Sequence, residues 1–181
     1  PVYMHELERE FSRNRWRFAS SNGRVDNKAA YGAAVDALTL MKVPQAEMAS
    51  RQMTEASVLS DINQLMDMEN DFRGNVAREE IMWFGPQKYE CYSFWDTRFA
   101  DAQEQLRKTM ANDTLNFSEE ELKTHFAVGH QPAWQKRGYD YSIRAIRTSL
   151  LDKKYDDYFK AKAGQAEIAI DKRIERVFIG K

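Results

Sequence analysis

Few residues in this 181-residue chain have the types and the spacing that chemistry requires. The three histidines are His5, His125 and His130, and the last two lie five positions apart, which leaves them off a common helical face. No cysteine or nearby pair of carboxylates completes a zinc site with them. We therefore expect no metal site.

Other catalytic or binding motifs are incomplete. The segment Asp67–Asp71 is spaced like the start of a calcium loop, but such a loop needs glycine and glutamate where this chain has Phe72 and Arg78. Cys91 lies among aromatic residues, which favours a buried apolar role over a reactive thiolate. The glycines and serines form neither a phosphate-binding loop nor a nucleophile elbow. We expect no catalytic residue, no cofactor and no small-molecule substrate, so the chain is not predicted to be an enzyme.

Tryptophan and arginine side chains are the best candidates for binding. Arg13, Arg15, Trp16 and Arg17 cluster in an amphipathic N-terminal segment, and Trp134 lies in a turn-rich connection. Tryptophan and arginine are enriched where protein interfaces have their strongest contacts. These five residues are the predicted partner contacts. The alternative is that the arginines form a solvated face and the tryptophans fill the core.

Composition and charge narrow the class of protein. Hydrophobic residues make up 43% of the chain and charged residues 30%, which fits a folded domain, and the longest purely apolar runs are a single helical turn. We therefore expect no transmembrane segment. The formal net charge of −1 lacks the basic excess typical of nucleic-acid-binding proteins, which disfavours RNA or DNA as the partner. One cysteine excludes an internal disulfide and favours a reducing compartment.

Helical periodicity dominates the chain. Only four prolines and eight glycines punctuate it, and alternating strand patterns are scarce. We expect nine or ten short helices with tight connections in one domain over residues 1–181, with an N-terminal helix in 1–23 and helical hairpins in 26–181. The predicted boundaries include an N-cap at Asp26 and a capping box from Ser118 to Glu121. Short connections impose antiparallel hairpins, which would stack side by side.

The predicted helices follow apolar stripes. Two boundaries are glycines: Gly74 is expected to end a helix beginning near Val58, and Gly164 to precede the last one. The expected helices are 7–18, 26–42, 44–53, 58–73, 76–84, an aromatic segment around 89–95 followed by 99–110, 119–126, 141–151, 153–162 and a closing helix through Val177.

The clearest hairpin is predicted between Tyr31 and Met53. Its first helix would carry Tyr31, Ala34, Val35 and Leu38 inward, Pro44 would open the second helix, and Ala46, Ala49 and Met53 would form the facing stripe.

This segment resembles the pentatricopeptide repeat, in which an alanine of the second helix is followed seven residues later by methionine. Ala102–Met110 and Tyr141–Lys162 resemble weaker copies. The resemblance implies an all-α fold of stacked antiparallel hairpins, a right-handed superhelix of the pentatricopeptide or tetratricopeptide type. In RNA-reading members, a polar residue two positions after the opening tyrosine selects a base. Ala33 and Ile143 occupy those places here, which disfavours base readout.

As a whole, the chain resembles the eighteen-kilodalton accessory subunits of the euglenozoan mitochondrial ATP synthase. The resemblance implies a non-catalytic structural subunit that binds the alpha subunit in the catalytic head, on the matrix side of the mitochondrion. The alternative is an organelle RNA-binding or mitochondrial ribosome-associated helical-repeat protein, and a cytoplasmic location also stays open. Pro1 is expected to follow either a removed initiator methionine or a removed targeting peptide. The first turns contain several acidic residues, unlike a transit peptide, so we expect the segment that begins at Pro1 to be mature protein.

Overall fold

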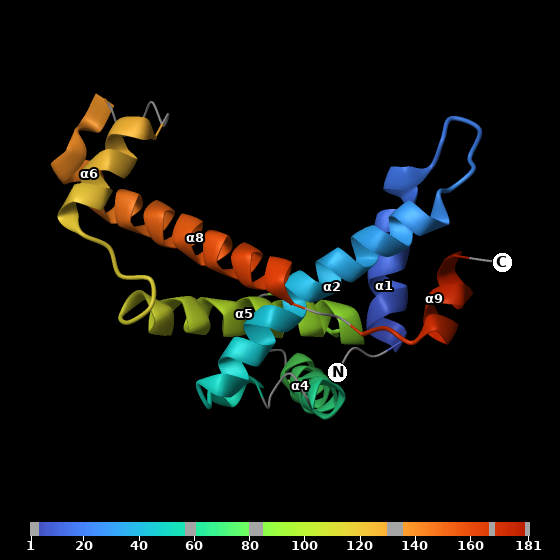
Figure 1. Cartoon of the computed structure of the whole chain (residues 1–181). Coiled ribbons are helices and arrows are strands. Elements are labelled where there is room, and N and C mark those ends of the chain that lie inside the picture. Colours follow the sequence, from blue (N-terminus) through green and yellow to red (C-terminus); the bar gives the residue numbers. More distant parts are fainter. Residues whose placement is uncertain (1–3, 57–60, 80–84, 130–135, 167–168, 180–181) are drawn as a thin grey trace. The chain divides into compact units, whose positions relative to one another are not determined.

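The computed structural model describes residues 4–56, 61–79, 85–129, 136–166 and 169–179 (Figure 1). Every named element in these ranges is helical, and the β-type pairing found there is a single bridge between Ala19 and Val25. The all-α prediction is therefore confirmed. The elements are α1 (Met4–Asn14), the 3₁₀ helix η1 (Arg15–Phe18), α2 (Asn27–Ser50), α4 (Ile62–Arg78), α5 (Cys91–Ala111), α6 (Glu119–Val128), α8 (Tyr139–Gln165) and α9 (Lys172–Ile179).

The chain divides into two compact units. The first unit comprises residues 1–45 and 156–181, and the second comprises residues 46–155. The divisions fall within α2 and α8, so each of these long helices contributes residues to both units. No helix in the described part of the chain is long and apolar enough to cross a membrane.

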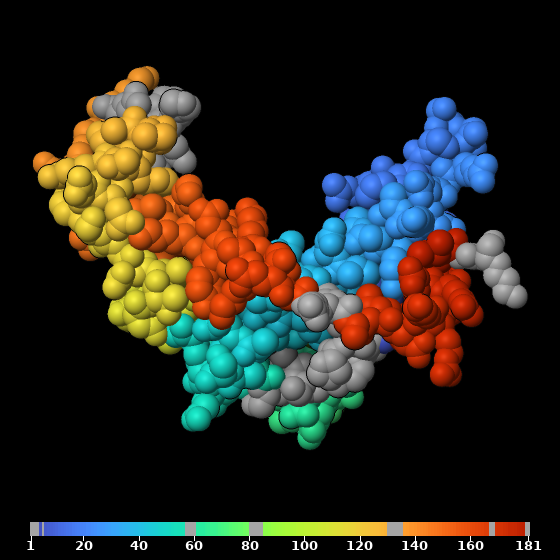
Figure 2. Space-filling view, in the orientation of Figure 1, coloured from blue at the N-terminus to red at the C-terminus, as the bar shows by residue number. Residues whose placement is uncertain are grey.

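The core of the first unit joins segments from both ends of the sequence. Its fully packed members come from α1, α2 and α9, and Figure 2 shows the red surface of α9 beside the blue surface of α2. The Phe178 ring lies 5.0 Å from the Phe11 ring and 5.9 Å from the Tyr31 ring, measured between centroids. The predicted inward stripe of α2 is confirmed by its contacts. The buried members of the core of the first unit are Leu7, Tyr31, Ala34, Leu38 and Phe178.

The beginning of α2 also agrees with the sequence. Asp26 Oδ1 accepts a hydrogen bond from the Ala29 backbone N–H at 3.0 Å, which satisfies one of the donors that a helix start leaves unpaired. Lys42 Nζ then binds Glu6 Oε1 at 2.7 Å, an ion pair that joins α2 to α1.

The predicted hairpin between Tyr31 and Met53 is wrong. Residues 27–50 form one helix of 24 residues that contains Pro44 in its interior. Proline removes one backbone hydrogen bond, but Pro44 and Met48 are fully buried, and that burial offsets the loss. The inward stripe of α2 continues through these two positions. Ala46 and Ala49, predicted to form a separate facing stripe, are exposed.

In the second unit, α4 and α5 pack together, and α4 runs past its predicted end at Gly74. The helix continues because Arg73 and Val76 are buried beside this glycine, so packing outweighs the glycine's low helix propensity. Val58 and residues 80–84 lie outside the described residues. The aromatic segment and the following stripe, predicted apart, join in α5, which opens with a capping box from Glu90 to Ser93.

Two side chains of α4 hold the connection to α5. Asn70 accepts from the Tyr89 backbone N–H at 2.7 Å and donates to the Tyr89 carbonyl at 3.0 Å. Arg73 donates to the Pro86 carbonyl and lies 4.5 Å from the centroid of the Tyr89 ring. These contacts pair the polar groups of a turn that has no regular structure of its own.

The capping box at Ser118 is confirmed. Ser118 Oγ accepts from the Glu121 backbone N–H at 3.1 Å, and Glu121 Oε2 accepts from the Ser118 backbone N–H at 2.8 Å. Helix α6 then packs against the first half of α8 through Leu122, Ile146 and Leu150. Figure 1 shows the ribbon of α6 beside the beginning of α8.

The two closing helices predicted over 141–151 and 153–162 are one helix, α8, of 27 residues. Nothing between Leu151 and Lys153 breaks a helix, and the buried stripe continues from Leu150 to Tyr155 and Phe159. Gly164 lies inside α8 and does not end it.

Candidate functional site

The predicted contact residues at the N-terminus lie where α1 gives way to η1. Asn14 Nδ2 donates to the Glu10 carbonyl at 2.8 Å, so the side chain of the last residue of α1 folds back onto the final turn of the helix. The chain then tightens into η1, and Gly23, at a φ of +80°, helps it turn back toward α2. This local geometry brings Arg13, Arg15, Trp16 and Arg17 onto one short segment, called here the arginine–tryptophan segment.

Trp16 is the most accessible large ring of this segment. Its side chain is 68% exposed, although tryptophan usually buries most of its surface. The guanidinium carbon of Arg15 lies 4.8 Å from the centroid of the Trp16 ring, a cation–π geometry that leaves part of the ring open to solvent. Arg15 Nε is buried, with no hydrogen-bond partner in the described part of the chain.

The two outer arginines, Arg13 and Arg17, have polar neighbours in α1. Arg13 Nη1 lies 3.4 Å from Glu10 Oε1, and Arg9 Nε lies 3.0 Å from the same carboxylate oxygen. Arg17 Nη1 donates to Asn14 Oδ1 at 3.2 Å. Glu10 therefore partly neutralises Arg13, and the ring that the arginines flank is the more distinctive feature of the segment.

A shallow depression of about 270 Å³ lies beside this segment in the first unit. Arg15 forms part of its wall, and Phe178 connects it to the core described above. Its lining residues are Glu8, Phe11, Ser12, Arg15, Asn27, Val177 and Phe178. Since apolar and polar groups share the wall, the depression can accept an amphipathic side chain of a partner.

Trp134, the fifth predicted contact residue, lies outside the described residues, as does His130. The side chain of His5 also lies outside them. The structure thus brings four of the five predicted contact residues together, and the role of all five stays a prediction.

The remaining candidates for chemistry have structural neighbours. His125 Nε2 lies 3.0 Å from Ser149 Oγ, a hydrogen bond between α6 and α8. The Cys91 thiol donates to Asn63 Oδ1 at 3.0 Å, between α5 and α4, and it is half-buried where the sequence favoured a buried position. Within the described ranges, no group of three or more histidine, cysteine, aspartate or glutamate side chains could hold a metal ion.

Two charged groups of α6 are strongly tied to neighbouring segments. Lys154 Nζ lies 2.6 Å from Glu121 Oε1, and its hydrogen bond, together with the backbone N–H of Ser118, lowers the pKa of the Glu121 carboxyl. Tyr139 Oη donates to Glu119 Oε1 at 2.6 Å. Desolvation of the phenol and this hydrogen bond raise the pKa of Tyr139 to about 12.

A second basic surface escaped the sequence analysis. It comprises Lys136, Arg137, Tyr141, Arg144 and Arg147, called here the α8 basic surface, and all five side chains are exposed. The signal is in the sequence, because Tyr141, Arg144 and Arg147 alternate with the buried Ser142, Ile146 and Leu150 at helical spacing. The net charge of −1 is a sum over the whole chain, so it does not reveal this local excess of positive charge.

No family model, no curated protein and no solved structure matches this chain.

Proposed function

We propose that this chain is a non-catalytic structural accessory subunit that binds another protein through the arginine–tryptophan segment. The observation that carries the proposal is the 68% exposure of Trp16, which Arg15 covers on one side at 4.8 Å. Burying such a ring in a partner's apolar pocket removes a large apolar area from water, which is the usual basis of a strong interface contact.

The depression beside Arg15 supports a protein partner. It lies next to the segment and has a mixed lining, so one partner surface could cover Trp16 and place a side chain in the depression.

We further propose that the partner is the alpha subunit in the catalytic head of the mitochondrial F-type ATP synthase, on the matrix side. This assignment rests on the sequence resemblance. With it we propose an arrangement of stacked helical hairpins, in which the pair α4 and α5 and the pair α6 and α8 take the place of the hairpins predicted at Tyr31 and Tyr141.

The test is recovery of the tagged full-length chain from mitochondria, followed by mass spectrometry. The proposal expects synthase subunits, with the alpha subunit at a fixed ratio to the chain. A matched Trp16→Ala variant should lose most of the alpha subunit while retaining its fold by circular dichroism. A Tyr92→Ala variant, which truncates another exposed ring, is the control and should retain the alpha subunit.

Two outcomes would contradict the proposal. Recovery of ribosomal proteins or RNA without synthase subunits would favour the alternative of an organelle RNA-binding or ribosome-associated helical protein. Equal recovery of the alpha subunit by the Trp16→Ala variant would remove the arginine–tryptophan segment as the contact.

A further inference from the structure

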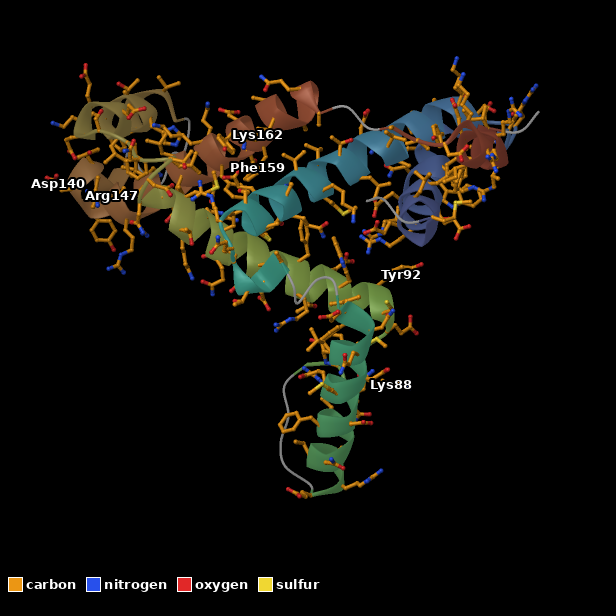
Figure 3. All side chains as sticks on the ribbon, turned by 60° about the horizontal axis from the view of Figure 1, so that its bottom comes forward. Lys88, Tyr92, Asp140, Arg147, Phe159 and Lys162 are labelled. Carbon is orange, nitrogen blue, oxygen red and sulfur yellow. The ribbon has the colours of Figure 1, made fainter. Side chains whose placement is uncertain are left out.

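The α8 basic surface lies on the side of the helix opposite its core contacts. Ile146 and Leu150 pack against α6, whereas Tyr141 is 73% exposed and Arg144 and Arg147 point to solvent. Figure 3 shows Arg147 together with Asp140 at the same end of α8. The surface therefore lies on a helix whose opposite face packs against α6.

Among the described residues, the cations of this surface have no ion pair, which distinguishes them from Arg51, Arg107 and Lys154 of the second unit. Arg51, Arg107 and Lys154 each bind a carboxylate at 2.6 to 2.7 Å. No ion pair is found for Lys136, Arg137, Arg144 or Arg147 in the part of the chain that the structure describes, and the carboxylate close to them in sequence is that of Asp140.

Tyr141 gives the surface an apolar centre. The guanidinium carbon of Arg137 lies 5.3 Å from the centroid of the Tyr141 ring, so this arginine is held over the ring by a cation–π contact. Arg144 and Arg147 follow within two helical turns of Tyr141, and the helical stretch from 139 to 147 spans roughly 12 Å at the rise of an α-helix. A short segment of a partner could cover all of it.

We propose that the α8 basic surface is a docking site for an acidic segment of a partner protein. An arginine over the tyrosine ring, with further exposed cations nearby in the chain, is complementary to carboxylates that flank an apolar side chain. A nucleic acid fits less well, because Glu119 lies directly beside the start of α8, bound to Tyr139, and Glu120 is exposed next to it. These acids confine the positive charge to a short stretch, which a short acidic segment can cover more completely than an extended polyanion can.

This site is separate from the arginine–tryptophan segment in sequence and in chemistry. The proposed function can therefore fail while this inference stands, and the reverse is also possible. The probe is a fluorescent glutamate-rich peptide with one central leucine, titrated into the full-length chain, with its glutamine counterpart as the uncharged control. A uridine oligonucleotide of similar length tests the other class of ligand.

The structure predicts salt-dependent binding of the glutamate peptide and little binding of the glutamine peptide. An Arg144→Gln/Arg147→Gln variant should bind the glutamate peptide about tenfold more weakly, since two exposed ion pairs are lost. An Arg144→Lys/Arg147→Lys variant keeps the charges and should retain most of the affinity. The matched control, Arg24→Gln/Arg78→Gln, removes two exposed arginines that belong to neither proposed site and should bind within about twofold of the unchanged chain.

Three results would overturn the proposal. The first is no measurable binding of the glutamate peptide by the unchanged chain. The second is an equal loss of affinity in both glutamine double variants, which would indicate a general charge effect. The third is tighter binding of the oligonucleotide than of the peptide, with that affinity lost in the Arg144→Gln/Arg147→Gln variant, which would make this surface a nucleic-acid site.

Discussion

The arginine–tryptophan segment and the α8 basic surface use similar residues in opposite ways. In the first, Arg13 lies beside Glu10, Arg17 donates to the neutral side chain of Asn14, and Trp16 is 68% exposed. In the second, Arg144 and Arg147 have no ion pair among the described residues, and Tyr141 is 73% exposed beneath Arg137, much as Trp16 lies beneath Arg15. The comparison teaches that the same composition can create an apolar anchor or an electrostatic surface, depending on where the carboxylates lie.

This difference predicts different responses to salt. Burial of an apolar ring is insensitive to ionic strength, whereas attraction between exposed charges is screened within about 10 Å at 0.1 M salt. Binding through Trp16 should therefore survive high salt, and binding through Arg144 and Arg147 should not. The experiments below either sharpen this contrast or remove it.

The largest expected effect is on the cores behind the two surfaces. Phe178→Ala in the first unit and Ile146→Ala in the second should each lower the free energy of unfolding by about 3 kcal/mol, because each removes a buried side chain and leaves a cavity. Urea unfolding followed by circular dichroism measures both. A change below about 1 kcal/mol in either variant would show that the side chain does not support its surface.

Trp16→Ala should have the next largest effect, and on binding alone. We expect the affinity for the partner to fall by about 2 kcal/mol, or roughly thirtyfold, because an interface tryptophan commonly contributes this much. Stability should change by less than about 0.5 kcal/mol, since the ring is largely exposed.

Calorimetric titration with the purified catalytic head measures the loss at low and high salt. If the Trp16→Ala variant bound more weakly than the unchanged chain only at low salt, Trp16 would not be an apolar anchor, and the two surfaces would bind in the same way.

Ser118→Ala should have a smaller effect, on the support of the α8 basic surface. The substitution removes the side-chain acceptor for the Glu121 backbone N–H at the start of α6, which should destabilise the second unit by about 1 kcal/mol. Ser118→Asp restores an acceptor and should recover most of the loss in urea unfolding. No recovery would indicate that the hydroxyl acts in another way.

The smallest effect concerns one tyrosine in each unit at alkaline pH. The pKa of Tyr139 is raised to about 12, above its ordinary value of 10.0, by desolvation and the bond to Glu119. The pKa of Tyr31 is raised by burial and by Glu175. A raised folded-state pKa stabilises the protein below the unfolded value, so Tyr139 should contribute stability below pH 10 that is lost as the pH rises through about 12.

Tyr139→Phe should therefore lose less stability than the unchanged chain over that range. Tyrosinate absorbance gives the titration directly, and urea unfolding at each pH gives the stability. A Tyr139 that ionises near pH 10 would show that its bond to Glu119 is weak in solution.

Local signals in the sequence were sufficient for several features. The capping box at Ser118 and the N-cap at Asp26 were predictable because each depends on atoms within three residues of one another. The inward stripe of Tyr31, Ala34 and Leu38 was predictable because helical periodicity alone determines it. The N-terminal cluster was also predictable, since its members are neighbours in the chain.

The breaks between helices were not predictable from punctuation alone. Pro44 and Gly74 are both helix-breaking types, and both lie inside helices. Their intrinsic cost is about 1 to 3 kcal/mol, and burying Met48 beside the first and Val76 beside the second can offset it. Propensity is a local quantity, whereas burial depends on segments far away in the chain.

The sequence by itself determined that this protein is helical and where several helices begin and which way they face, because periodicity and capping act over a few residues. Only the tertiary structure decided that α2 and α8 continue where breaks were expected. It also decided that Trp16 is exposed and that Arg144 and Arg147 are unpaired among the described residues. Exposure and pairing depend on which distant residues come near a side chain, and that is settled only when the helices pack.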